Sequence, residues 1–104
     1  MKFLRFSMFD AAKTAEMSQV SDKVMANLPP GLKVLAAYTC LGNPFPATVP
    51  PNALISVAVM EAESAEAIVA TAYPAMLAGA QMWYVPVMEV SIGAAAEQEK
   101  KYRA

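Results

Sequence analysis

The sequence predicts a single α+β domain with the element order β-α-β-β-α-β and a helical tail at the C-terminus. Four segments have the alternating or continuously apolar pattern of strands, and two stretches with helical periodicity lie between them. Prolines and glycines stand at most of the boundaries between these segments. The chain has 104 residues, 57% of them hydrophobic, which is enough for one core but not for two.

The first predicted strand covers residues 2–9. Its side chains alternate between two faces: Phe3 and Arg5 lie on one side, and Phe6 and Met8 lie on the other. A period of two, together with three phenylalanines, is typical of a strand. We therefore expect Arg5 to be a charged residue in the middle of a strand.

The first predicted helix covers residues 11–28. Asp10 can accept hydrogen bonds from its free amides. Apolar side chains such as Met17 and Val24 recur at three- and four-residue steps, which is the pattern of an amphipathic helix. The Pro-Pro-Gly sequence at 29–31 ends this helix, because proline cannot continue the backbone hydrogen bonds.

The second and third predicted strands, residues 32–41 and 54–61, enclose a stiff loop. The loop contains four prolines and an apolar Phe45 that can cover a pocket or reach a partner. The third strand is rich in β-branched residues and almost uncharged, which suits a central position in the sheet. The prolines are Pro44, Pro46, Pro50 and Pro51. We expect one face of the second strand to hold Leu32, Val34, Ala36, Tyr38 and Cys40.

The second predicted helix begins after Ser64, whose hydroxyl can cap it, and ends at Gly79. Pro74 lies inside this stretch, so we expect a break or kink near Tyr73. The fourth strand is predicted over residues 81–90.

Proline within a strand cannot donate to the ladder, so Pro86 places the fourth strand at an edge or at a bulge. The last segment, residues 94–103, has a helix-forming composition, and it either docks or frays. It contains two pairs of opposite charge at four-residue spacing, Glu97 with Lys101 and Glu99 with Arg103.

This order is the ferredoxin-like split βαβ arrangement, with sheet order 4-1-3-2 and both helices on one face. The domain is expected to cover residues 1–92, with the tail at 93–104. We expect the other sheet face to be apolar and to be covered by a second copy, because monomers rarely expose large apolar faces. The residues expected on it are Phe3, Phe9, Tyr38, Cys40, Ser56, Met60, and either Trp83 or Tyr84.

The chain resembles the dimeric α/β-barrel superfamily, and most closely its short members of unknown function. The resemblance covers the topology of residues 1–92 and three local sequences. These are Pro-Pro-Gly-Leu-Lys-Val at 29–34, Val-Met-Glu-Ala at 59–62 and Val-Pro-Val-Met at 85–88. The resemblance implies a homodimer whose two sheets pack face to face, with a pocket between each sheet and its helices.

Composition excludes several classes of function. A net charge of −1 argues against a general binder of nucleic acid or of an anionic membrane. The absence of histidine removes Ser-His-Asp and Cys-His catalysis and histidine metal sites. One cysteine allows no internal disulfide, and no run is long enough for a membrane span or a signal peptide. We expect a cytoplasmic protein without a cofactor or metal.

The candidate site centres on Arg5. This cation either binds a carboxylate or enolate ligand, forms a structural ion pair with Glu61 or Glu89, or keeps its head group in solvent. The side chains expected to line a ligand site are Arg5, Ser7, Tyr38, Cys40, Ser56, Trp83 and Tyr84. The eight methionines are either flexible pocket walls or core filler.

Three functions follow from these patterns. The first is binding of a small apolar or aromatic ligand, or support of a protein assembly. The second is a cofactor-less isomerase, cyclase or monooxygenase acting on an aromatic or polyketide-like compound, with Arg5 holding an acidic group and Tyr38 or Tyr84 donating to an oxyanion. The third is a structural subunit with a filled barrel. The fold alone does not choose among them.

Overall fold

A computed structural model describes residues 1–45 and 49–103, so the predicted loop proline Pro46 and the last tail residue Ala104 lie outside the described residues. The predicted element order is confirmed, with an additional short 3-10 helix, η1, before the first α-helix. The elements are β1 (Lys2–Asp10), η1 (Ala11–Lys13), α1 (Thr14–Ala26), β2 (Leu32–Thr39), β3 (Ala53–Ala62), α2 (Ala65–Leu77), β4 (Gln81–Val87) and α3 (Ala95–Arg103).

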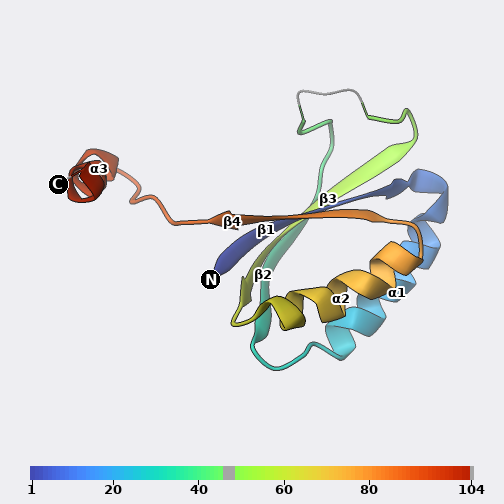
Figure 1. Cartoon of the computed structure of the whole chain (residues 1–104). Helices are drawn as coiled ribbons and strands as arrows, with labels where there is room; N and C mark the ends of the chain where they lie inside the picture. The colour runs from blue at the N-terminus through green and yellow to red at the C-terminus, as the bar shows by residue number, and fades with distance from the viewer. Residues whose placement is uncertain (46–48, 104) are drawn as a thin grey trace.

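The four strands form one antiparallel sheet in the order β2-β3-β1-β4, which is the predicted order 4-1-3-2 read from the other side. Helices α1 and α2 cover one face of this sheet (Figure 1). β4 pairs only with β1 and is therefore an edge strand, which accommodates Pro86 as expected. It ends at Val87, three residues before the predicted end.

The helix starts follow the sequence, but the predicted break in the second helix is wrong. The Asp10 carboxylate accepts a hydrogen bond from the Ala12 amide at 2.9 Å, and the Ser64 hydroxyl accepts one from the Ala67 amide at 3.2 Å. α2 continues through Pro74 to Leu77. Pro74 has no amide to donate to the Ala70 carbonyl, but both residues are exposed, so water can reach that carbonyl and the helix loses a single internal hydrogen bond.

The structure also corrects the expected assignment of the sheet faces. Residues paired across antiparallel strands share a face, and β1 pairs Phe3 with Met60 and Ser7 with Ser56. These four side chains, and Phe9 with them, face the helices rather than the open side. Both faces of β1 carry large apolar residues, so alternation alone did not distinguish them.

A β-bulge in β2 explains a second correction. Val34 pairs with Met60, and Ala36 pairs with the adjacent residue of β3, Val59. Leu35 is therefore an extra residue in β2 that has no partner of its own in β3. The insertion reverses the alternation after this point. Leu32 and Val34 therefore face the helices, whereas Ala36 and Tyr38 lie on the open face, and the predicted common face of the strand is wrong.

The best-packed part of the molecule lies between the sheet and the start of α2, and we call it the packed cluster. Its buried members are small or flexible apolar side chains, and no large side chain among the described residues is fully buried. The partly buried residues around it include Phe3, Leu28 and Tyr84. The buried members are Leu32, Ala58, Met60, Ala62 and Ala67.

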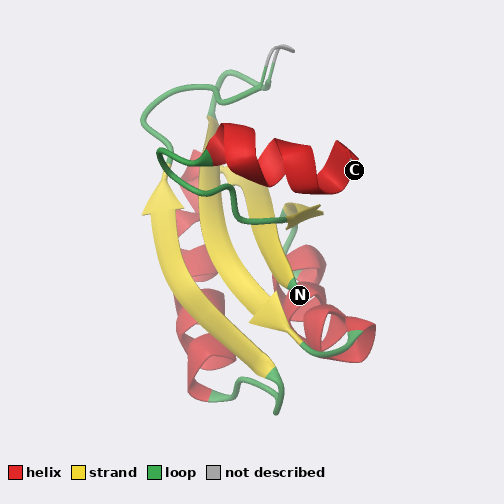
Figure 2. Ribbon diagram, turned by 90° about the vertical axis from the view of Figure 1, so that its left-hand side faces the viewer, coloured by secondary structure: helices red, strands yellow, loops and turns green. Residues whose placement is uncertain are grey.

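The C-terminal arm, residues 88–103, extends away from this body. Figure 2 looks from the side of α3 and shows the sheet in front of α1 and α2, with α3 in front of the sheet. The tail is helical as predicted, and Arg103 pairs with Glu99, but Glu97 pairs with Lys100 instead of Lys101. Among the described residues, no helix has the length and apolar character required to cross a bilayer.

Candidate functional site

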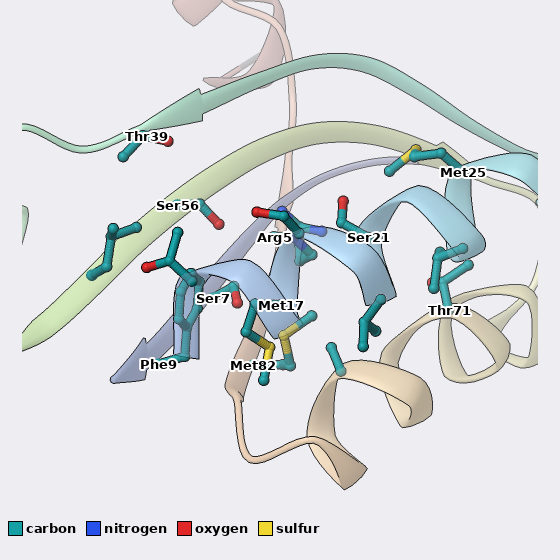
Figure 3. A pocket seen from close by; sticks show the side chains of 16 residues that line it. Arg5, Ser7, Phe9, Met17, Ser21, Met25, Thr39, Ser56, Thr71 and Met82 are labelled. Atoms are coloured by element: carbon teal, nitrogen blue, oxygen red, sulfur yellow. The ribbon is translucent and has the colours of Figure 1, made fainter. Parts of the chain in front are cut away.

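A pocket of about 240 Å³ lies between the helix-covered face of the sheet and helices α1 and α2. All four strands and both helices contribute to its lining (Figure 3). Half of the lining is apolar, with Met17 and Met82 among the walls, and Arg5 is the single charged residue. The other polar residues are seven hydroxyls: Ser7, Thr14, Ser18, Ser21, Thr39, Ser56 and Thr71. We call this site the Arg5 pocket.

The position of Arg5 in the pocket follows from the geometry of β1. The strand places it between Phe3 and Ser7 on the helix-covered face, opposite Ala58 of β3 and Tyr84 of β4. Its Nε is buried and has no hydrogen-bond partner among the described residues. Burial lowers the pKa of Arg5, because desolvation disfavours the cation, while the neighbouring Tyr84 acts in the opposite direction. Arginine is so strongly basic that it remains charged here.

Neither acidic partner considered from the sequence pairs with Arg5. Glu89 forms its ion pair with Lys2. Glu61 lies opposite Lys2 and Lys33 in the sheet, on the open face, whereas Arg5 points to the helices. Within residues 1–45 and 49–103, no carboxylate forms an ion pair with Arg5. The predicted structural ion pair is therefore wrong, and the guanidinium lies in the pocket without a counter-charge.

Tyr84 lies beside Arg5 but belongs to the packed cluster rather than to the pocket lining. Its phenol oxygen is buried without a hydrogen bond of ordinary geometry among the described residues. Burial raises the pKa of Tyr84, and interactions with Thr71 and Arg5 oppose this rise. Thr71 donates its own hydroxyl hydrogen to the Ile68 carbonyl at 2.8 Å. Tyr84 is therefore a neutral phenol at neutral pH.

The structure brings some of the predicted site residues together and separates others. Ser7 and Ser56 pair across β1 and β3, and both line the pocket with Arg5. Tyr38 and Trp83 lie on the opposite face of the sheet, because of the bulge in β2 and the register of β4. The expectation that one of Trp83 and Tyr84 faces the helices and the other the open side is confirmed.

Cys40 follows the end of β2 and is half-buried, and it is not part of the lining of the Arg5 pocket. Its amide donates a hydrogen bond to the Ile55 carbonyl at 2.8 Å. Cys40 therefore does not share a site with Arg5.

Sequence reasoning missed the hydroxyl side chains that α1 contributes. Thr14, Ser18 and Ser21 recur at steps of four and three residues, so they lie on one side of the helix, followed at the next step by Met25. Figure 3 shows Arg5 between Ser21 of α1 and Ser56 of β3. This polar stripe runs beside the apolar stripe that includes Met17, and its spacing was visible in the sequence.

A second hollow, of about 450 Å³, lies on the open face of the sheet. Phe45 folds back from the β2–β3 loop onto this face, with its ring centroid 5.4 Å from Phe6 and 5.7 Å from Trp83. The predicted covering role of Phe45 thus corresponds to a contact within its own chain. We call this hollow the open-face groove; Met8, Val49, Pro50 and Val85 complete it.

Among the described residues, no three acidic, cysteine or histidine side chains gather in an arrangement that could hold a metal ion. The Arg5 pocket in particular offers hydroxyls and thioethers but no carboxylate. Its chemistry suits an anion rather than a cation.

No protein-family model and no curated protein matches the sequence. Among solved structures, a DUF3240 family protein from Shewanella baltica OS155 aligns with 88% of this chain and 94% of its own, at 9% identity and a TM-score of 0.43. A hydantoinase/carbamoylase family amidase from Burkholderia ambifaria aligns with 98% of this chain but 32% of its own, at 13% identity and a TM-score of 0.37. At these TM-scores neither similarity bears on function, and the ferredoxin-like assignment rests on the strand order and helix placement described above.

Proposed function

We propose that this protein binds a small anionic molecule, a carboxylate with an apolar or aromatic body, in the Arg5 pocket. The observation that carries the proposal is a guanidinium with a buried, unpaired Nε in a pocket without any acidic side chain. Leaving a buried donor without a partner costs about 1–3 kcal/mol. A bound carboxylate would accept a hydrogen bond from this nitrogen and remove the cost, which supports an anion as the ligand.

The remaining lining supports a carboxylate attached to an apolar body. The planar guanidinium can hold both carboxylate oxygens, and Ser7 and Ser56 can donate further hydrogen bonds. Met17 and Met82 offer flexible thioether walls that adapt to an aliphatic or aromatic group. The pocket volume of about 240 Å³ is below the roughly 300–1,000 Å³ of sites for drug-sized ligands, which favours a smaller molecule.

Binding has more support than the alternative of a cofactor-less isomerase, cyclase or monooxygenase. Such an enzyme needs a group that moves a proton near the substrate. Arg5 is the one ionisable side chain in the lining, and its pKa is too high for this task. Tyr84 keeps its proton and lies outside the lining. The pocket therefore offers recognition of an anion, without an acid–base pair.

Calorimetric titration with matched probes tests the proposal. Benzoate and hexanoate carry the expected charge, and benzyl alcohol and hexanol are their neutral counterparts. We expect the carboxylates to bind about tenfold or more tightly than the alcohols, because hydrogen bonds to charged groups contribute roughly 1.5–3 kcal/mol. Arg5→Gln should abolish this preference.

Lys33→Gln is the matched control, because it removes one cation from the exposed side of β2 on the open face. Its titration curves should coincide with those of the unmodified protein. Equal affinity for carboxylates and alcohols, or an unchanged preference in Arg5→Gln, would overturn the proposal.

A further inference from the structure

The hydroxyl side chains of the Arg5 pocket differ in whether the protein already uses them. Thr14 donates its hydroxyl hydrogen to the Ala11 carbonyl at 2.6 Å, and Thr71 donates its own to the Ile68 carbonyl at 2.8 Å. The other hydroxyls of the lining form no side-chain hydrogen bond with any residue of 1–45 or 49–103, so they remain available to a ligand or to water. These are Ser7, Ser18, Ser21, Thr39 and Ser56.

The most buried of these hydroxyls belongs to Ser7, at the floor of the pocket. Ser7 is 6% exposed, and Thr71 is the other buried polar residue in the described part of the chain. Thr71 has a carbonyl partner, whereas Ser7 has none and lines the pocket together with Arg5. Because a buried polar group without a partner costs free energy, this floor favours an occupant that carries oxygen atoms.

A simple carboxylate would use only part of the available hydroxyls. Its two oxygens accept about four hydrogen bonds, and a guanidinium that binds both oxygens takes two of these positions. Ser7 and Ser56, which pair across β1 and β3 in the same lining as Arg5, can supply the other two. The hydroxyls of α1 are then left without a ligand atom. A carboxylate also has no hydrogen to donate to their oxygens.

Ser21 of α1 lies on the helix side of the guanidinium. Figure 3 shows Arg5 between Ser56 on the sheet and Ser21 on the helix. Ser21 is exposed, so its hydroxyl is hydrated when no ligand is bound. A ligand that binds Arg5 approaches this hydroxyl and displaces its water, which lowers affinity unless the ligand replaces the lost hydrogen bonds. A ligand hydroxyl replaces them, because it can both donate and accept.

The methionines of the lining determine where the rest of the ligand can lie. Met17 of α1 is 7% exposed, and Met82 of β4 pairs with Ser7 across the strands. Their thioethers offer an apolar wall to an aliphatic or aromatic group. A carboxylate, a hydroxyl and an apolar body would therefore contact three different kinds of side chain. Three unlike contacts in a fixed arrangement distinguish a chiral ligand from its mirror image.

We propose that the carboxylate bound in the Arg5 pocket carries a hydroxyl on the carbon next to its carboxyl group, and that Ser21 recognises this hydroxyl. The ligand class is a 2-hydroxy acid with an apolar or aromatic body. The adjacent position follows from the place of Arg5 between Ser21 and Ser56. The inference rests on the proposed function, because it requires the carboxylate to bind Arg5.

The two enantiomers of mandelate, with phenylacetate and 2-phenylethanol, form a matched set of probes for calorimetric titration. Mandelate is phenylacetate with a hydroxyl at the 2-position, and its enantiomers have the same size, charge and hydropathy. We expect one enantiomer to bind about two- to tenfold more tightly than phenylacetate, which is the gain from one additional net hydrogen bond. The other enantiomer should bind no more tightly than phenylacetate.

Ser21→Ala should remove the difference between the enantiomers and leave the affinity for phenylacetate unchanged. Gln19→Ala is the matched control, because it also shortens an exposed polar side chain of α1 but lies outside the pocket lining. It should keep the difference between the enantiomers. Both substitutions are at exposed positions, so both variants should retain the circular dichroism spectrum of the unmodified protein.

The titrations separate failure of this inference from failure of the proposed function. Enantiomers that bind equally, or a difference that persists in Ser21→Ala, would overturn the inference. The carboxylate proposal would still stand in that case if phenylacetate binds more tightly than 2-phenylethanol. Equal affinities for phenylacetate and 2-phenylethanol would overturn the proposed function and the inference together.

Discussion

The packed cluster and the Arg5 pocket lie on the same face of one sheet, the cluster beneath the start of α2 and the pocket beneath α1 and α2, yet one is filled and the other is hollow. On β3 they are two residues apart: Ala58 in the cluster is 1% exposed, while Ser56 lines the pocket. The cluster is built from apolar side chains, whereas the pocket combines a cation with hydroxyls on α1. The comparison teaches that residue chemistry, rather than backbone topology, decides which part of this fold is core and which is site.

Shortening one methionine in each region should give the largest difference in the free energy of unfolding. Met60 is 3% exposed in the packed cluster, so Met60→Ala should lower the free energy of unfolding by about 2–5 kcal/mol. Met82 lines the hollow, so Met82→Ala should lower it by roughly 1 kcal/mol or less. Urea denaturation of both variants measures these losses. Equal losses would mean that the two regions are packed alike.

Enlarging one side chain of β3 in each region should give a smaller difference in stability, and the variant in the packed cluster should again be the less stable one. Ala58→Val introduces bulk where no space remains and should destabilise the fold by about 1–3 kcal/mol. Ser56→Val points into the pocket and should change stability by no more than about 0.5 kcal/mol. Thermal unfolding compares the two. A strongly destabilised Ser56→Val would contradict the presence of free space beside it.

Replacing Arg5 with an apolar residue should give the smallest change in the free energy of unfolding, and this change should be an increase. Arg5→Met removes a half-buried charge without an ion-pair partner among the described residues and supplies an apolar stem, so stability should rise by about 1 kcal/mol. The same substitution should remove carboxylate binding. Urea denaturation without ligand is the measurement. A clear loss of stability would show that Arg5 holds the fold together rather than serving a ligand.

The element order and the sheet topology could be predicted because their signals are local. Strand periodicity, the caps at Asp10 and Ser64, and the edge position implied by Pro86 are all confirmed. The tolerance of α2 for Pro74 was not predictable from the residue itself, because it depends on whether the Ala70 carbonyl, which loses its amide partner, is exposed to water.

The faces of the sheet could not be assigned from local signals. β1 is apolar on both sides, so its alternation does not say where Arg5 points. The extra residue Leu35 has no sequence signature, yet it moves Tyr38 to the face opposite Arg5. Ser7 and Ser56 were placed with Arg5 in the sequence interpretation because strand alternation was sufficient for them. The hydroxyls of α1 could not be assigned to the site because apolar periodicity locates the buried stripe of a helix and does not say whether polar residues beside that stripe face solvent or a pocket.

The two edges of the sheet share a property that limits how copies of this protein aggregate. β2 is distorted by the bulge at Leu35, and β4 carries Pro86, which has no amide hydrogen to offer a neighbouring strand. Neither edge presents a long regular ladder, so stacking of sheets edge to edge into fibrils is disfavoured at both ends. Both edges thus resist the open-ended strand addition that leads to amyloid, even though the open face of the sheet carries exposed apolar side chains such as Trp83 and Val85.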